Sequence, residues 1–129
     1  MDCKLFDGIA DHIIGSNYEN EECVRRTSSG RYYYFVYHTV KDWLLKHHPD
    51  LIAGMGGSSH EKLRFCMEQL SIDKSNRKFG MLALKLNQLH RIRVHADYTL
   101  DNEFTSSQVT ILQKERDRVC ELLKELEDV

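Results

Sequence analysis

Residues 79–98, FGMLALKLNQLHRIRVHADY, decide the fold of this chain. Apolar residues recur in this stretch every three or four positions, which is the spacing of one face of an α-helix. They are Phe79, Leu82, Leu86 and Leu89, and the next two positions of the same stripe are Arg93 and Ala96. The stretch therefore predicts a helix that reaches about Tyr98 and buries one face against other helices.

The segments before and after this helix also begin with helix signals. Ser58 with Glu61, and Thr105 with Gln108, match the capping box, in which two side chains satisfy free backbone N–H groups at a helix start. The first box predicts a helix whose apolar stripe is Leu63, Cys66, Met67 and Leu70. The second predicts a final amphipathic helix whose stripe is Val109, Leu112, Val119, Leu123 and Leu126, with Arg116 at one stripe position.

The first half of the chain predicts two further helices. Residues 20–48 contain no proline, and their apolar side chains keep helical spacing. The β-branched and aromatic residues at 32–40 also fit a buried strand, but the helical period persists beyond them, so we favour a helix. A short helix is expected within residues 2–15. Pro49 ends the long helix, and we expect the glycine-rich residues 49–58 to form a flexible loop.

Length and composition favour a single all-α domain. The chain has 129 residues, of which 41% are hydrophobic and 29% are charged, and this balance is typical of a globular protein rather than a disordered one. One proline and seven glycines leave little room for the many turns of a β-sandwich or barrel. We therefore expect residues 1–129 to form one up-and-down bundle of about five helices.

Charge and cysteine content indicate a cytoplasmic protein. The formal charge is −2, from eighteen Lys and Arg and twenty Asp and Glu, so contact with nucleic acid would need a local basic patch. The four cysteines form no CxxC pair, and we expect them to be reduced thiols. The first fifteen residues lack a signal-peptide core, and no apolar run approaches the roughly 20 residues that span a bilayer.

The strongest candidate site lies on the helix predicted at residues 79–98. Arg91 and His95 are four residues apart, so they share one helix face with Gln88 and Tyr98. Arg93 continues the apolar stripe, so we expect it to be buried and paired with a carboxylate such as Asp97, with a phosphate, or with a group across a dimer.

A second arginine–histidine pair occurs on the helix predicted at residues 20–48. Arg31 and His38 are seven residues apart and face one way, with Tyr34 and Phe35 between them. A histidine can move the proton of an RNA 2′-hydroxyl while an arginine holds the phosphate, so both pairs suit RNA cleavage. The alternative interpretation is structural, because an arginine four residues from a histidine arises often by chance and aromatic runs usually pack cores.

Metal and cofactor sites are not expected. His90 and His95 are five residues apart and diverge by about 140° on a helix, and no cysteine or carboxylate pair completes a site around them. The glycine-rich stretch lacks the lysine and the preceding strand of a phosphate-binding loop.

Three segments resemble HEPN-domain proteins, small helical bundles of prokaryotic toxin–antitoxin and defence systems. Residues 26–38, RTSSGRYYYFVYH, are similar to the second helix of that family. Ser59-His60 is similar to the Ser-His pair that opens its third helix, and residues 89–98, LHRIRVHADY, resemble its LxxLRxxADY segment. The resemblance covers roughly residues 20–126 in order and spacing.

The resemblance implies a homodimer in which the fourth helices of two subunits meet across a cleft. Many members are metal-independent endoribonucleases that act as toxins or defence effectors. By this comparison Arg91, His95, Arg93 and Tyr98 are the candidate catalytic residues, and Arg31, His38, Asp97 and Gln88 are the candidates for binding or orienting RNA. Possible partners are an antitoxin or a nucleotidyltransferase-like protein.

The spacing of the motif leaves a second interpretation open. Three residues separate Arg91 from His95 and the tyrosine follows His95 by three positions, whereas the catalytic signature of the family has four to six intervening residues and a tyrosine two positions after the histidine. Arg93 with Ala96, Asp97 and Tyr98 also matches an RxxADY pattern of members that lack the catalytic signature. The alternative is therefore a non-catalytic HEPN-like module that binds a nucleotide, an RNA or a protein partner.

Overall fold

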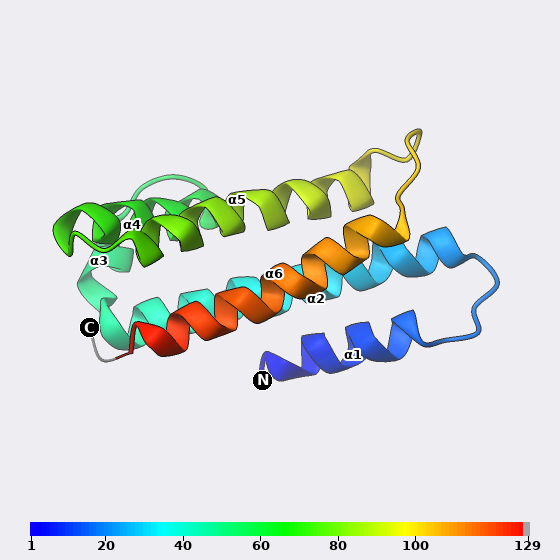
Figure 1. The fold of residues 1–129 in the computed structure, drawn as a ribbon, viewed down its shortest axis with the longest axis horizontal. Helices are drawn as coiled ribbons and strands as arrows, with labels where there is room; N and C mark the ends of the chain where they lie inside the picture. The colour runs from blue at the N-terminus through cyan, green and yellow to red at the C-terminus, as the bar shows by residue number, and fades with distance from the viewer. Residues whose placement is uncertain (128–129) are drawn as a thin grey trace.

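The computed structural model describes residues 1–127, which form six α-helices and no strand (Figure 1). The helices are α1 (Lys4–Ile14), α2 (Glu21–His47), α3 (Pro49–Gly54), α4 (Ser59–Asp73), α5 (Arg77–Tyr98) and α6 (Ser106–Glu125). The prediction of an all-α bundle is confirmed, with one helix more than the five expected.

The additional helix corrects the prediction for residues 49–58. The long helix does end before Pro49, but Pro49 itself is the first residue of α3, where its missing N–H costs no hydrogen bond. Only residues 55–58 connect α3 to α4. Pro49 therefore both ends α2 and begins α3.

The predicted helix starts agree with the structure. Ser58 Oγ accepts a hydrogen bond from the Glu61 N–H, and the Glu61 carboxylate accepts one from the Ser58 N–H, both at 3.3 Å. Before α6, Gln108 Oε1 accepts a hydrogen bond from the Thr105 N–H at 2.9 Å. The whole of residues 32–40 lies within α2, so the helix interpretation of that aromatic segment is confirmed.

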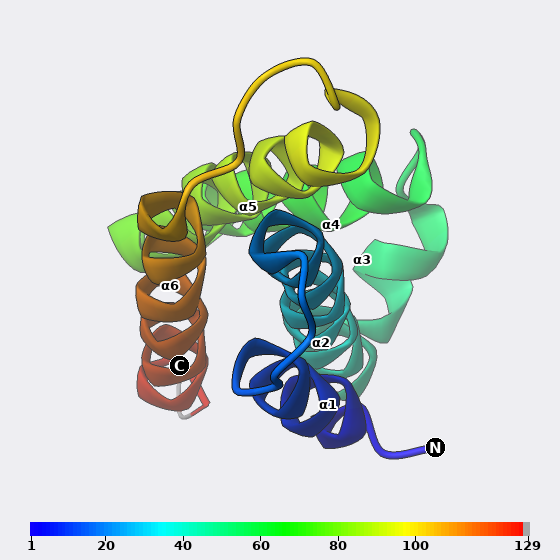
Figure 2. The ribbon, with the colours of Figure 1, turned by 90° about the vertical axis from the view of Figure 1, so that its right-hand side faces the viewer.

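Helix α2 lies at the centre of the bundle and contacts the other five helices. Figures 1 and 2 show α4 and α5 on one side of α2, α1 on the opposite side, and α6 alongside. Helix α5 runs opposite to α2 and α6 (Figure 1). Gly30 is buried in α2, and a Cβ there would lie in ordinary van der Waals contact, 3.9 Å, with Asp97 Oδ1 of α5, so the Asp97 side chain reaches α2 at this point.

The core contains the predicted apolar stripes and further side chains outside them, among which Tyr32, Phe104 and Leu122 are large and fully buried. Its largest fully buried side chains come from α2, α4, α5, α6 and the residues just before and after α6, and they are Tyr32, Tyr33, Phe79, Phe104, Leu44, Leu63, Met67, Leu82, Leu89, Leu112, Leu122 and Leu126. Arg116, at the polar position of the α6 stripe, donates a hydrogen bond to Asp7 at 2.9 Å and thereby ties α6 to α1. Among residues 1–127, none of the helices combines the length and apolar character that a membrane crossing requires.

Candidate functional site

The predicted site residues of α5 do not all lie together. Gln88 and Arg91 are exposed, and Tyr98 is 70% exposed at the end of the helix. His95 is half-buried, its ring packs 5.7 Å from the ring of Phe104, and its Nε2 is buried without a hydrogen-bond partner. Arg91 therefore faces solvent, whereas one nitrogen of His95 is closed off from a substrate.

Arg93 has the partner that the sequence predicts. Its Nε lies 2.9 Å from Asp97 Oδ2 but forms no hydrogen bond, so this contact is a pairing of charges. Nη2 donates a hydrogen bond to the Tyr34 hydroxyl at 3.3 Å. The guanidinium carbon also lies 5.6 Å from the centre of the Tyr98 ring. With 14% of its side chain exposed, Arg93 is held in place at the edge of the surface.

Tyr34 joins the two candidate regions of the sequence. The guanidinium carbons of Arg31 and Arg93 lie 5.1 Å and 5.5 Å from the centre of its ring, within the range of cation–π contacts. His38 stacks on Phe6 of α1, with ring centres 5.7 Å apart. Arg31 of α2 and Arg93 of α5 thus meet at Tyr34, while His38 is occupied by packing against α1.

A histidine pair on α4 and α5 is the most compact polar group near these residues. The rings of His60 and His90 are stacked, with centres 4.4 Å apart and planes inclined by 22°. The Tyr33 hydroxyl of α2 lies 2.6 Å from His60 Nδ1, and the Tyr37 ring lies 5.3 Å from the His60 ring. We call Tyr33, Tyr37, His60 and His90 the histidine cluster.

The surroundings of the cluster favour uncharged imidazoles. Burial lowers the pKa of His60, and the charges of His90 and Arg93 lower it further. Burial also lowers the pKa of His90, and Arg93 and Arg64 add to this effect, which Glu61 opposes. Burial raises the pKa of the Tyr33 hydroxyl far above its usual value, so Tyr33 stays protonated.

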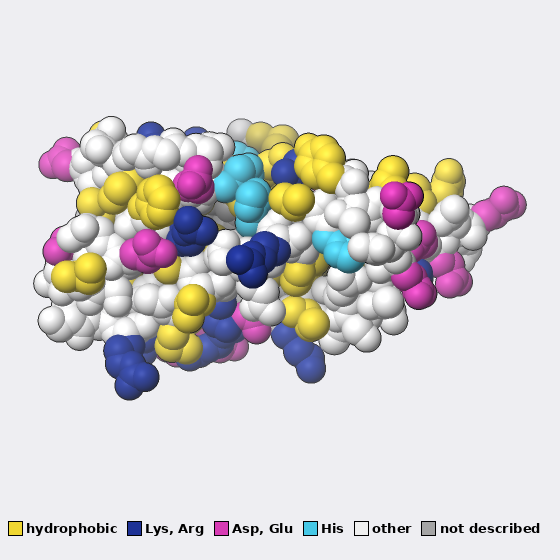
Figure 3. All heavy atoms as spheres, turned by 90° about the horizontal axis from the view of Figure 1, so that it is seen from above, with side chains coloured by type: hydrophobic (Ala, Val, Ile, Leu, Met, Phe, Trp, Pro, Cys, Tyr) yellow, Lys and Arg dark blue, Asp and Glu magenta, His cyan; other side chains and the backbone are white. Residues whose placement is uncertain are grey.

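Arginine side chains border the histidine pair on both helices. Arg64, one turn after His60 on α4, donates a hydrogen bond from Nη1 to Asn87 Oδ1 at 3.0 Å. His60, Arg64, Asn87 and His90 line a small pocket of about 20 Å³ together with Glu61 and Leu86. Seen from the side of α4 and α5 (Figure 3), histidine atoms lie beside a hollow in the surface, next to basic side chains.

The histidine cluster is not among the residues predicted from the sequence, although the sequence contains a signal for it. His60 and Arg64 are four residues apart, His90 and Arg93 three, and Tyr33 and Tyr37 four, so each helix presents two polar groups on one face. Spacing along α5 relates His90 only to residues of its own helix, such as His95. The short turn between α4 and α5 makes them antiparallel neighbours, and this arrangement brings His60 to His90.

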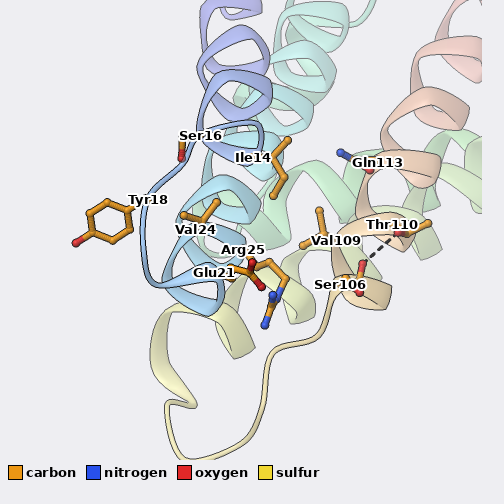
Figure 4. Close-up of a pocket in the computed structure, with 10 residues that line it drawn as sticks. All are labelled: Ile14, Ser16, Tyr18, Glu21, Val24, Arg25, Ser106, Val109, Thr110 and Gln113. Carbon is orange, nitrogen blue, oxygen red and sulfur yellow. Dashed lines mark hydrogen bonds between the residues drawn. The ribbon is translucent and has the colours of Figure 1, made fainter.

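A larger pocket of about 340 Å³ lies between the α1–α2 connection and the start of α6 (Figure 4). Several of the polar groups that line it already form hydrogen bonds within the protein. Arg25 Nε donates to the Phe104 carbonyl, Gln113 donates to the Tyr32 hydroxyl, and Thr110 donates to the Ser106 carbonyl. The Tyr18 ring points away from the other lining residues (Figure 4). This pocket therefore offers fewer uncommitted groups for recognition than the face of α4 and α5.

Within residues 1–127 the structure brings together no group of three or more His, Cys, Asp or Glu side chains that could hold a metal ion. Comparisons with protein-family models, with curated proteins and with solved structures found no match to this chain.

Proposed function

We propose that this protein acts on RNA as a HEPN-like, metal-independent endoribonuclease, with the α5 side of the bundle as its RNA contact. The observation that carries the proposal is the alignment of arginines from two helices around Tyr34, beside two half-buried histidines. Arginines hold phosphate, and imidazoles transfer protons near neutral pH, so one surface offers both functions. The toxin or defence role, the cytoplasmic location and the antitoxin-like or nucleotidyltransferase-like partner belong to the same proposal, through the family resemblance.

The chemistry expected of such a site is attack by the neighbouring 2′-hydroxyl. An imidazole takes the proton of that hydroxyl, and arginines such as Arg91 and Arg93 offset the charge that develops on the phosphate. Gln88, Tyr98 and Asp97 complete the proposed contact: the first two are exposed along α5, and Asp97 holds Arg93.

The test is incubation of the purified protein with structured and unstructured RNA in EDTA. We expect products that carry a 2′,3′-cyclic phosphate and a 5′-hydroxyl. A substrate with a 2′-deoxy sugar at the cleaved position should bind without being cut. Cleavage that requires added metal, or cutting of the deoxy substrate, contradicts the proposal.

Binding is tested separately from cleavage with Arg91→Ala. Arg91 is exposed and makes a phosphate contact in this proposal. Its loss should therefore weaken binding to all RNA sequences alike, and the number of counterions released on binding, which is read from the salt dependence of the affinity, should fall by about one. Lys74→Ala is the matched control, since Lys74 is exposed in the turn between α4 and α5, before the start of α5 and far along the chain from its end at Tyr98. If the two substitutions weaken RNA binding equally, the RNA does not bind at Arg91 and the proposed contact is wrong.

The second candidate is a non-catalytic module that uses the same face to hold a nucleotide, an RNA or a protein partner. Two observations favour it: the pairing of Arg93 with Asp97, and the buried Nε2 of His95. This candidate predicts that RNA or a nucleotide binds without any product in the cleavage assay.

A further inference from the structure

The histidine cluster lies outside the residues that the arginine–histidine pattern of α5 selects. His60 and His90 come from two helices, so the pair exists only in the folded bundle. Both residues are half-buried, which leaves part of each ring accessible. A half-buried pair of titratable rings in direct contact is unusual for a purely structural role, because burial and mutual repulsion both disfavour its charged form.

We propose that His60 and His90 are the proton-transfer pair for cleavage of an RNA phosphodiester, with Arg64 and Arg93 beside the phosphate. This inference rests on the proposed action on RNA and assigns its chemistry to residues other than His95. Arg64 lines the same small pocket as both histidines, and Arg93 is one helical turn after His90. The positive charges of Arg64 and Arg93 attract a phosphate to a position close to His60 and His90, whose uncharged imidazoles are favoured by burial.

The size of the pocket limits what the cluster can recognise. About 20 Å³ holds little more than one oxygen atom or one water, so a phosphate oxygen can enter and a nucleobase cannot. The sugar and base of the substrate must lie on the open surface of α4 and α5. The inference therefore predicts cleavage of single-stranded RNA with little preference among bases.

Two stacked imidazoles can supply the acid and the base of one reaction. Protonation of one ring disfavours protonation of the other, so the pair holds at most one proton, and the negative charge of a bound phosphate favours this singly protonated form. The uncharged ring takes the proton of the 2′-hydroxyl as the bond from that oxygen to phosphorus forms. The charged ring gives its proton to the 5′-oxygen as the bond from phosphorus to that oxygen breaks. The pair ends with one proton, as it began, and the products are a 2′,3′-cyclic phosphate and a 5′-hydroxyl.

Tyr33 is a positioning residue in this scheme. Its hydroxyl can donate to His60 Nδ1 or accept from it, so the 2.6 Å contact persists when His60 gains or loses a proton. The contact leaves Nε2 as the nitrogen of His60 that serves a substrate. The other groups facing the pair are Tyr37 from α2, Glu61 and Arg64 from α4, and Arg93 from α5.

The decisive experiment compares RNA cleavage by His60→Gln, His90→Gln and a matched control, His12→Gln, which removes an exposed histidine of α1. We expect each cluster variant to lose roughly a hundredfold or more in rate, the usual contribution of a general acid or base, and the control to keep its rate. Tyr33→Phe should lower kcat roughly tenfold with KM unchanged and should alter the pH profile of the rate, because His60 loses its orientation.

The competing variant is His95→Gln. Loss of cleavage in His95→Gln, with cleavage retained in His60→Gln and His90→Gln, overturns this inference and leaves the proposed function standing. If the wild-type protein cuts no RNA, the nuclease function fails, and NMR of the histidine rings then tests the phosphate site with a nucleoside 3′-monophosphate. Shifts of the His60 and His90 resonances, without a shift for His12, support the site. Unshifted resonances of His60 and His90 overturn it.

Discussion

At the scale of single residues, Arg93 shows how a charge is accommodated at a position that the apolar stripe assigns to a leucine. Its guanidinium is paired with Asp97, bonded to the Tyr34 hydroxyl and flanked by two aromatic rings. Asp97 has 35% of its side chain exposed, so water compensates part of the charge when the pair is broken.

We therefore expect Asp97→Asn to lower the free energy of unfolding by about 1 kcal/mol, more than a fully exposed ion pair and less than a fully buried one. In a chain of this size that corresponds to roughly 3 to 6 °C in Tm, which thermal unfolding followed by circular dichroism can measure. Asp101→Asn, in the exposed segment after α5, is the control and should leave Tm unchanged. Equal Tm values for the two variants would show that the pair contributes nothing.

The histidine cluster makes stability depend on pH. Since the fold lowers the pKa of His60 and His90, the unfolded chain binds protons more readily than the folded one as pH falls below about 6.5. Their contribution to stability is therefore present at neutral pH and is lost as pH falls toward 5. Tm measured from pH 7 to pH 5 should fall less steeply in His60→Gln and in His90→Gln than in the wild type or in His12→Gln. Parallel slopes in all four proteins would contradict this expectation.

At the scale of elements, the end of α5 depends on one side chain of α2. Arg26 is 8% exposed, and its Nη1 donates hydrogen bonds to the carbonyls of His95, Ala96 and Thr99 at 3.0 to 3.2 Å. Nη2 donates to the carbonyl of Asn102. The His95 carbonyl also accepts from the Thr99 N–H, but those of Ala96, Thr99 and Asn102 are ones that a helix end and the loop after it otherwise leave to water, so Arg26 holds α5 and residues 99–105 together.

Removal of Arg26 should destabilise the protein through these unpaired carbonyls. We expect Arg26→Ala to lower the free energy of unfolding by about 3 kcal/mol. Arg26→Lys should recover only part of this loss, because an ammonium has fewer donors than a guanidinium and lacks its fork geometry. Arg77→Ala, at the exposed start of α5, should change stability by less than about 0.5 kcal/mol. Urea unfolding measures the free energy of unfolding of all three variants. A loss in Arg26→Ala no larger than in Arg77→Ala would contradict the capping role.

At the scale of the whole molecule, the outer face of α5 suggests a surface for a second copy of the chain. Leu84 and Tyr98 are 73% and 70% exposed on this helix, and Met81 is 38% exposed. The HEPN resemblance implies pairing through the same helix. We expect light scattering at micromolar concentration to give about twice the chain mass of 15.2 kDa.

Leu84→Glu should convert such a dimer to a monomer, because it puts a charge into the centre of the apolar contact. Leu5→Glu is the matched control, since Leu5 is 60% exposed on α1, on the opposite side of α2 from α5. A wild-type monomer contradicts the dimer, and equal effects of both substitutions contradict its placement on α5.

The sequence by itself determined five of the six helices of residues 1–127, all but α3, because their signals are local. A capping box spans four residues, an apolar stripe repeats every three or four, and backbone hydrogen bonds reach from one residue to the fourth before it. For this reason the predicted starts at Ser58 and Thr105 and the end of α5 at Tyr98 agree with the structure, as does the pairing of Arg93 with Asp97 one turn away.

Only the tertiary structure decided which side chains meet between helices. The contact of His60 with His90, the reach of Arg26 to the end of α5, and the turn of His95 toward Phe104 depend on how each helix is rotated and crossed against its neighbours. Periodicity indicates which face is buried but leaves the facing partner undetermined, because many crossings bury the same apolar area. The candidate chemistry of this protein lies in those contacts between helices.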